Sequence, residues 1–194
     1  MAGNEDRRAV RTKKKLKKAL LTLLEEKDLL DLTITEVAQF AGCNRVTFYS
    51  HYKDLQSLLS AIVDEYLDGL VANFRRSIQN RKSITANDVS RQVPIFEYIY
   101  ENQFVFSLIL KGEVLPGSQN QFCESLVKVS GSELELKDKT AVEIPVLNYF
   151  STYGSLGFFL YWAMTDFKEP PEVMAQKLAY LQGKMFVEAT VRDK

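Results

Sequence analysis

Side chains that can contact nucleic acid are concentrated in one short stretch near the start of this 194-residue chain. An arginine can bind both acceptor atoms of guanine in the major groove, and smaller side chains can meet thymine methyl groups or phosphate oxygens. The residues of suitable type are Thr33, Thr35, Asn44, Arg45, Val46, Thr47, Tyr49, Ser50, His51 and Lys53. We expect them to contact DNA if the local fold presents them together.

Two short helices joined by a glycine turn would present such a surface. Thr33 followed three residues later by Glu36 is a capping box, in which each side chain bonds a backbone amide at the helix start. The apolar residues of this first helix keep helical spacing: Ile34, Val37, Ala38 and Ala41. Gly42 can take the left-handed conformation that ends a helix, and Asn44 can cap the next helix.

In the second helix, Phe48 and Tyr52 are four residues apart and are predicted to face the core together. This leaves a polar face exposed, as in the recognition helix of a helix-turn-helix protein, which lies in the major groove. An ordinary helix pair in an all-helical domain would also have capping boxes and glycine turns. The spacing alone therefore leaves both interpretations open.

Over residues 10–70 the chain resembles the tetracycline-repressor (TetR) family of bacterial regulators. The residues that match the family pattern are Thr33, Ile34, Val37, Ala38, Ala41, Gly42, Thr47, Phe48, Tyr49 and Tyr52, followed by Leu58 and Leu59 in the fourth helix. The resemblance implies a transcriptional regulator, typically a repressor, that binds DNA and is controlled by a ligand or partner bound to its C-terminal part. Leu55 departs from the pattern, because the family usually carries a phosphate-contacting lysine there. Its absence predicts weaker binding to every DNA sequence alike, unless Lys53 substitutes.

A run of basic residues precedes the helix pair. It consists of Arg7, Arg8, Arg11, Lys13, Lys14, Lys15, Lys17 and Lys18. Such a run attracts phosphates over a Debye length of about 8 Å at physiological salt and can lie along a minor groove. The alternative is a solvated segment that serves solubility alone.

Residue counts argue against several other functions. The formal net charge is zero, and the chain contains one histidine and two cysteines, Cys43 and Cys123. These numbers exclude a disulfide framework and a Cys/His zinc pattern, and they leave only His51 for a histidine-based catalytic triad. We therefore expect no enzyme activity, no metal and no cofactor. No apolar segment approaches the roughly 20 residues that span a bilayer, so we expect a soluble, cytoplasmic protein.

We predict an all-α fold with two domains, a helix-turn-helix head over residues 1–54 and a regulatory and dimerisation body over residues 55–194. Past Leu55 the pattern favours helices throughout, with loops at 80–87 and 112–117, and with a connection or short helix at 129–139. The stretch 141–165 has apolar residues all round, which predicts a helix buried on most sides.

Two glycines lie inside this apolar stretch. Gly154 and Gly157 each cost a helix interior about 1 kcal/mol against alanine, so they predict close approach by another helix or by a ligand. After Pro170 and Pro171 a last amphipathic helix is expected, with apolar residues Met174, Leu178, Leu181 and Met185. The broad apolar surfaces of these two helices predict a homodimer, and the resembled family dimerises through such a four-helix bundle.

Dimerisation would set the form of the DNA site. Two heads about 34–36 Å apart fit successive major grooves, so a roughly palindromic operator is expected. Apolar pockets are usually lined by aromatic residues. The candidates for an effector site are Phe96, Tyr100, Phe104, Tyr149, Tyr153 and Trp162, with plain core packing as the alternative for each.

A less specific resemblance concerns regulators of dihydroxyacetone-kinase operons. It rests on the aromatic region around Phe96–Phe106 and on Gly154, Gly157, Trp162 and a Pro-Glu-x-Met motif at Pro171, Glu172 and Met174. This branch would allow activation as well as repression. Two alternatives remain: a coregulator that acts through a partner protein with little DNA binding of its own, and an enzyme or carrier whose head resembles a DNA reader by accident.

Overall fold

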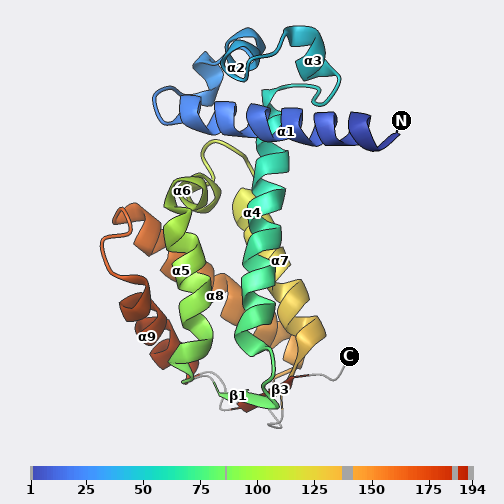
Figure 1. The fold of residues 1–194 in the computed structure, drawn as a ribbon. Coiled ribbons are helices and arrows are strands. Elements are labelled where there is room, and N and C mark those ends of the chain that lie inside the picture. Colours follow the sequence, from blue (N-terminus) through green and yellow to red (C-terminus); the bar gives the residue numbers. More distant parts are fainter. Residues whose placement is uncertain (1, 86, 137–141, 185–187, 192–194) are drawn as a thin grey trace. The chain divides into compact units, whose positions relative to one another are not determined.

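The computed structural model describes residues 2–85, 87–136, 142–184 and 188–191 (Figure 1). The elements are α1 Ala2–Leu24, a 3-10 helix Leu29–Asp31, α2 Ile34–Phe40, α3 Arg45–Tyr49, α4 Leu55–Ile78, β1 Ser83–Thr85, α5 Val89–Glu101, α6 Gln103–Lys111, α7 Ser118–Glu133, β2 Leu134–Leu136, α8 Ile144–Met164, α9 Pro171–Gln182 and β3 Glu188–Val191. The predicted all-α class is confirmed, with one small sheet added.

The chain divides into two compact units, Met1–Glu65 and Tyr66–Lys194, so that α4 contributes to both. From here on, the head is the first of these units, residues 1–65, and the body is the second, residues 66–194. A functional boundary after Asp54 stays a proposal.

The head closes around the apolar faces of its helices. Its fully buried side chains, all at most 1% exposed, are Leu16 and Leu20 of α1, Val37 and Ala38 of α2, Phe48 of α3, and Leu58, Leu59, Ile62 and Val63 of α4. α1 packs against α2, and α2 packs against α3. The helical spacing expected from the sequence therefore becomes the core that holds α3 in place.

The body has an aromatic core. α5 packs against α9, and α8 packs against α6 and α7. Phe96 of α5 lies 4.9 Å from Phe159 and 5.4 Å from Trp162 of α8, between ring centroids. Phe122 of α7 meets Phe159 edge to face at 5.5 Å. These side chains are all at most 3% exposed, so they join the helices of the body into one core.

The sequence did not predict three short strands in the body. β1, β3 and β2 form an antiparallel sheet in that order, in which Ser83 lies opposite Thr190 and Leu134 lies opposite Val191. The first strand lies inside the predicted loop 80–87. In the segment 129–139, α7 continues to Glu133 and β2 follows, and residues 137–139 lie outside the described part. Strands of three or four residues are too short for a periodic pattern to identify them.

The prediction that α8 would be buried on most sides was also wrong. An apolar stripe of this helix faces away from the rest of the subunit, and its large members are Val146, Phe150, Tyr161 and Met164, which are 53%, 68%, 62% and 68% exposed. Gly154 and Gly157 lie between them along the stripe, and apart from the adjacent backbone of α8 no heavy atom of the described chain would lie within 4 Å of a Cβ at either position. Among the described residues of one subunit, no helix closely approaches these glycines.

Candidate DNA-binding surface and body cavity

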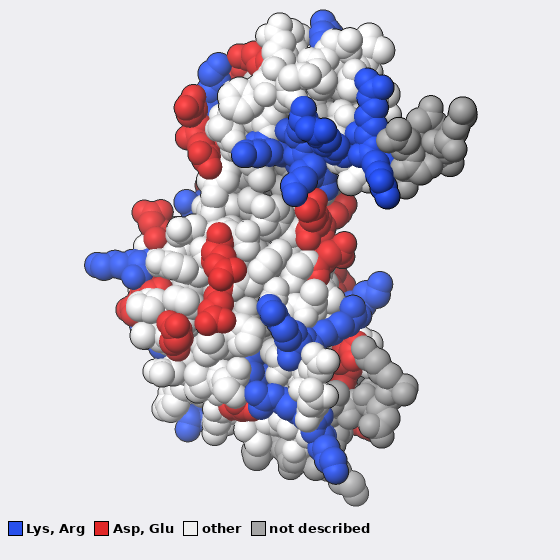
Figure 2. Space-filling view, in the orientation of Figure 1, with Lys and Arg blue, Asp and Glu red and all other residues white. Residues whose placement is uncertain are grey.

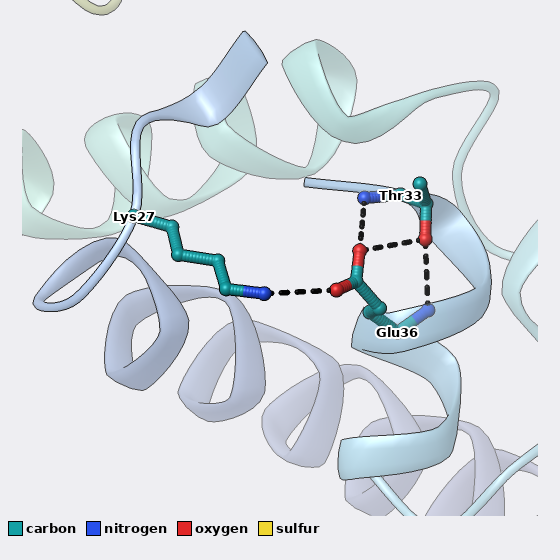
Figure 3. A network of polar contacts seen from close by, with 3 residues as sticks. All are labelled: Lys27, Thr33 and Glu36. Atoms are coloured by element: carbon teal, nitrogen blue, oxygen red, sulfur yellow. Dashed lines mark hydrogen bonds and ion pairs between the residues drawn. The ribbon is translucent and has the colours of Figure 1, made fainter. Parts of the chain in front are cut away.

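The predicted capping box forms at the start of α2. The amide of Glu36 donates to Oγ1 of Thr33 at 3.2 Å, and the amide of Thr33 donates to Oε2 of Glu36 at 2.9 Å. Lys27 adds an ion pair, with Nζ 3.0 Å from Oε1 of Glu36 (Figure 3). The hydrogen bonds from Thr33, followed by that from Lys27, lower the pKa of Glu36 to about 2. A charged Glu36 therefore ties the loop before α2 to the helix start.

The turn between α2 and α3 also forms as predicted. Gly42 has a φ of +70°, and the amide of Cys43 donates to the carbonyl of Ala38 at 2.9 Å, which ends the first helix. Asn44 caps α3, because its Oδ1 accepts the amide of Thr47 at 2.8 Å and the hydroxyl of Thr47 at 3.0 Å. The start of α3 is thus held by two bonds from one side chain.

The predicted DNA-contacting residues lie on three local elements. Asn44, Arg45, Val46, Thr47, Tyr49 and Ser50 belong to α3 and its caps, Thr33 and Thr35 to the start of α2, and His51 and Lys53 to the segment before α4. Seven of the ten are exposed, whereas Thr35, Thr47 and His51 are half-buried. Val46 and Tyr49 are 77% and 50% exposed, while Phe48 between them is fully buried. One face of α3 is therefore exposed to solvent, and the other packs into the core of the head.

Two features concern the basic side chains of this surface. The Arg45 guanidinium lies 5.9 Å from the ring centroid of Tyr49, one helical turn away, which restricts its orientation. Figure 2 shows the lysines and arginines of α1 gathered on one face of the head. Most of the basic run is exposed, but Lys17 is used internally: its Nζ lies 2.7 Å from both the Ala61 carbonyl and Glu65 Oε2 of α4.

Leu55 is the first residue of α4 and is half-buried. The helix start is capped by Asp54, whose Oδ1 accepts the amide of Ser57 at 2.7 Å, while Ser57 Oγ accepts the amide of Asp54 at 3.1 Å. Ser57 bonds back to the amide of the capping residue Asp54, as Glu36 bonds back to the amide of Thr33 at the start of α2. A phosphate-contacting cation near this point would have to come from Lys53, which is exposed.

The body contains a cavity of about 180 Å³ between α5, α7, α8 and α9. Its lining is mostly apolar, with Phe74, Ile95, Phe96, Leu126, Leu134, Ile144, Leu147, Phe159 and Leu178. Polar groups come from Arg91 and Gln92 of α5, Gln182 of α9, and Ser130, Asn148, Ser151, Thr152 and Ser155 of α7 and α8. A mostly apolar hollow with a few polar groups is the usual form of a small-molecule site.

Of the six aromatic residues predicted to line an effector site, Phe96 alone lines this cavity. Trp162 is fully buried and donates its indole N–H to the Glu169 carbonyl at 2.9 Å, and Tyr100 stacks on it at 6.0 Å. Phe104 is half-buried on α6. Tyr149 and Tyr153 stack on each other at 6.1 Å, are 45% and 37% exposed, and both donate to Glu124 of α7.

The cavity residues Arg91, Gln92 and Gln182 were not among the predicted site residues. A signal was present, because Arg91 and Gln92 fall on the same helical stripe as Ile95, Phe96 and Ile99, all of them buried. Two polar residues in line with an apolar stripe point into the interior of a fold. Gln182, more than eighty residues further along the chain, gave no comparable signal.

Within the part of the chain that the structure describes, no three His, Cys, Asp or Glu side chains lie close enough to share a metal ion. The same residues contain no helix of the length and apolar character that crosses a membrane.

Comparison with known proteins points to one family. Residues 92–183 match the family model TetR_C_8, "Transcriptional regulator C-terminal region". The chain is 22% identical over 164 residues to the "Uncharacterized HTH-type transcriptional regulator YxbF" of Bacillus subtilis (strain 168). This alignment covers 84% of the chain, which spans 42% of that relative's length.

Solved structures share the fold. A TetR transcriptional regulator from Streptococcus agalactiae 2603V aligns with a TM-score of 0.67 at 21% identity, over 94% of this chain and 99% of that one. The dihydroxyacetone kinase operon activator DhaS aligns with a TM-score of 0.60 at 15% identity, over 91% of this chain and 98% of that one. At these identities the likeness is one of fold.

Proposed function

We propose that the chain is a transcriptional regulator of the TetR family, which binds a palindromic DNA operator as a homodimer under control of a molecule bound in the body. A regulator of this kind works on DNA in the cytoplasm. The main support for the proposal is the form of α3. This capped helix exposes Arg45, Val46, Tyr49 and Ser50 on one face and buries Phe48 on the other. This is the form of a helix that enters a major groove.

Binding energy and sequence preference would come from different side chains. The exposed basic residues of α1 suit the phosphate backbone, which provides affinity without sequence preference. Arg45 is the best candidate for base readout, because it is exposed and one helical turn from a partly exposed Tyr49. We infer that Asn44 and Thr47 serve mainly to fix α3, since their side chains are already bonded to each other.

The exposed stripe of α8 supports a homodimer. Val146, Phe150, Tyr161 and Met164 would bury their apolar surface against a second copy, and the open space at Gly154 and Gly157 would admit the partner's helix. On α9, Tyr180 and Leu181 are 66% and 50% exposed and would extend the same interface. Substitution Gly157→Leu should weaken the dimer at least about tenfold, as measured by analytical ultracentrifugation.

Control would act through the cavity of the body. A ligand that binds two states of the body unequally shifts the balance between them, and a change in the separation of the two heads would alter the fit to successive grooves. The cavity lining includes Phe74, which belongs to α4, the helix that contributes to both units. We infer that α4 would transmit a conformational change from the cavity to the head.

Selection of bound sequences from a random duplex pool at low and high salt tests the proposal. A palindromic motif with a steep salt dependence is expected from a dimeric operator-binding protein. Arg45→Ala should cost about 1–3 kcal/mol on the selected site and little on random DNA, whereas Lys14→Ala should weaken both alike. Equal losses on both kinds of DNA from both variants would remove the base-reading role of Arg45.

Leu55 favours one alternative, a coregulator that works through a partner protein. It predicts no enriched motif at either salt, together with weak binding to all DNA. The variant Leu55→Lys should then raise affinity for every sequence, because it adds one phosphate contact.

A further inference from the structure

Arg91 and Gln92 hold unused hydrogen-bonding capacity inside the body. Their side chains are 5% and 3% exposed, and both line the cavity. Within the described part of the chain, Nε of Arg91 and Oε1 of Gln92 have no hydrogen-bond partner. The remaining bonds join the two residues to α9: Arg91 Nη2 donates to Gln182 Oε1 at 3.4 Å, and Gln92 Nε2 donates to the same oxygen at 3.0 Å. Buried polar atoms without a partner are rare in folded proteins and require an explanation.

The charge of Arg91 is also incompletely balanced. Asp88 at the start of α5 is close enough to interact with it, but this carboxylate already pairs with Arg81 and accepts the hydroxyl of Ser90 at 2.6 Å. Two guanidinium groups therefore share one carboxylate. Burial lowers the pKa of Arg91 to about 10, so the side chain remains protonated at neutral pH.

The opposite wall of the cavity does not have this surplus. Asn148 of α8 donates to the Val127 carbonyl at 3.1 Å and accepts the hydroxyl of Ser130 at 2.8 Å. Ser155 donates to the Ser151 carbonyl at 2.8 Å and accepts from Gln182 Nε2 at 3.3 Å. Among the described residues, the buried side-chain atoms without a hydrogen-bond partner are thus both on the α5 side of the cavity, next to a positive charge.

We propose that this cavity binds the anion of a small apolar organic acid, with its carboxylate on Arg91 and its apolar part against Phe96, Leu126 and Leu147. Nε and Nη2 lie on one edge of the guanidinium plane, and that edge matches the two oxygens of a carboxylate. The long bond from Nη2 to Gln182 is the one that the ligand would replace. The inference rests on the proposed function in one respect, because it assigns the chemical class of the controlling molecule.

Two further features narrow the ligand. An apolar cavity of roughly 150 Å³ holds a molecule of the size of benzene, so one ring or a short chain suits the space here. The free Oε1 of Gln92 can only accept a hydrogen bond, which favours an acid that also carries a hydroxyl group. The probes are therefore benzoate, 4-hydroxybenzoate and hexanoate, each compared with an uncharged counterpart: benzamide, 4-hydroxybenzamide and hexanol.

Calorimetric titration of the full chain with these six compounds tests the proposal. At least one acid should bind about tenfold more tightly than its uncharged counterpart, and Arg91→Gln should reduce that affinity about tenfold or more. Arg76→Gln is the matched control: it removes the same charge from α4, outside the cavity lining, and should leave the affinity unchanged. Circular dichroism checks that each variant is folded.

Three outcomes would overturn the proposal: uncharged compounds that bind as tightly as the acids, Arg91→Gln with wild-type affinity, or no binding of any acid at millimolar concentration. If Arg91→Gln does not fold, Arg91→Lys takes its place, and it should also lose about tenfold because lysine lacks the planar fork. Acid binding without selection of a DNA sequence would support this site and contradict the proposed function. Operator binding without acid binding would support the proposed function and contradict this site.

Discussion

The head and the body treat their polar side chains in opposite ways. In the head, Thr33, Glu36 and Asn44 lie at or near the surface, and their side-chain oxygens accept backbone amides at helix starts. In the body, Arg91 and Gln92 are buried and keep atoms without partners. A surface that binds a rigid duplex gains affinity when its side chains are already ordered in the free protein. A ligand cavity instead needs hydrogen-bonding groups that have no partner until the ligand binds.

The largest expected effect concerns the packing under the exposed face of α3. Phe48→Ala should lower the free energy of unfolding by about 3–5 kcal/mol, because it removes a fully buried ring from the head core. Val46→Ala, two residues away and 77% exposed, should change it by less than about 0.5 kcal/mol. Urea unfolding followed by circular dichroism measures both. Similar losses from the two variants would contradict an α3 with one anchored and one free face.

The next prediction compares two arginines. Arg91→Met should raise the free energy of unfolding of the ligand-free protein by about 1–3 kcal/mol, because it replaces a buried and incompletely paired charge with an apolar chain. Gln182 and Asp88 keep their bonds to Gln92 and Arg81 in this variant. Arg45→Met at the exposed face should stay within about 0.5 kcal/mol of the wild type. Thermal and urea unfolding test the pair, and a loss of stability from Arg91→Met would show that this arginine is satisfied in the free protein.

The turn of the head provides a third prediction. Gly42→Ala should cost about 1–2 kcal/mol of stability, because alanine is strained at a φ of +70° although space for its Cβ is open. Gly42→Asn should cost less, since asparagine tolerates the left-handed region. The unfolding midpoints in urea compare the two variants. An alanine variant as stable as the wild type would mean that the turn relaxes to another conformation.

The smallest effect is a pH dependence in the head. The folded pKa of Glu36 is about 2, below the ordinary 4.5, so its stabilising contribution is fully present above about pH 4.5 and is lost as the pH falls toward 2. Glu36→Gln should flatten the dependence of stability on pH in this interval. Unfolding measured at decreasing pH, at low and high salt, checks the result, and high salt should reduce the difference because the ion pair with Lys27 is exposed. An unchanged slope in the glutamine variant would assign the acid transition to other carboxylates.

The head was predictable because its signals are local. The capping box joins Thr33 to Glu36, the cap of α3 joins Asn44 to Thr47, and each acts between residues three apart in the chain. The side chains that form the head core follow the same short spacing. Local bonds and helical periodicity leave their signature in adjacent residues, so the sequence contained both the helix pair and its exposed face.

In the body, the decisive contacts join residues far apart in the chain. Ser83 pairs with Thr190 in the sheet, and Arg91 and Gln92 meet Gln182 at the cavity. The aromatic residues between Phe96 and Trp162 were equally suited to a core or to a pocket. Their number did not decide between the two, because both environments favour large apolar side chains.

By itself, the sequence determined the helical class, the helix-turn-helix and the two glycines of the apolar helix, since these depend on residue types and short spacings. Only the tertiary structure decided two features. One face of α8 with apolar side chains is exposed at the surface of the subunit. Arg91, whose Nε has no hydrogen-bond partner among the described residues, lines a mostly apolar cavity. Burial is a property of the assembled chain, because the same stripe is core or surface according to which helices pack against it.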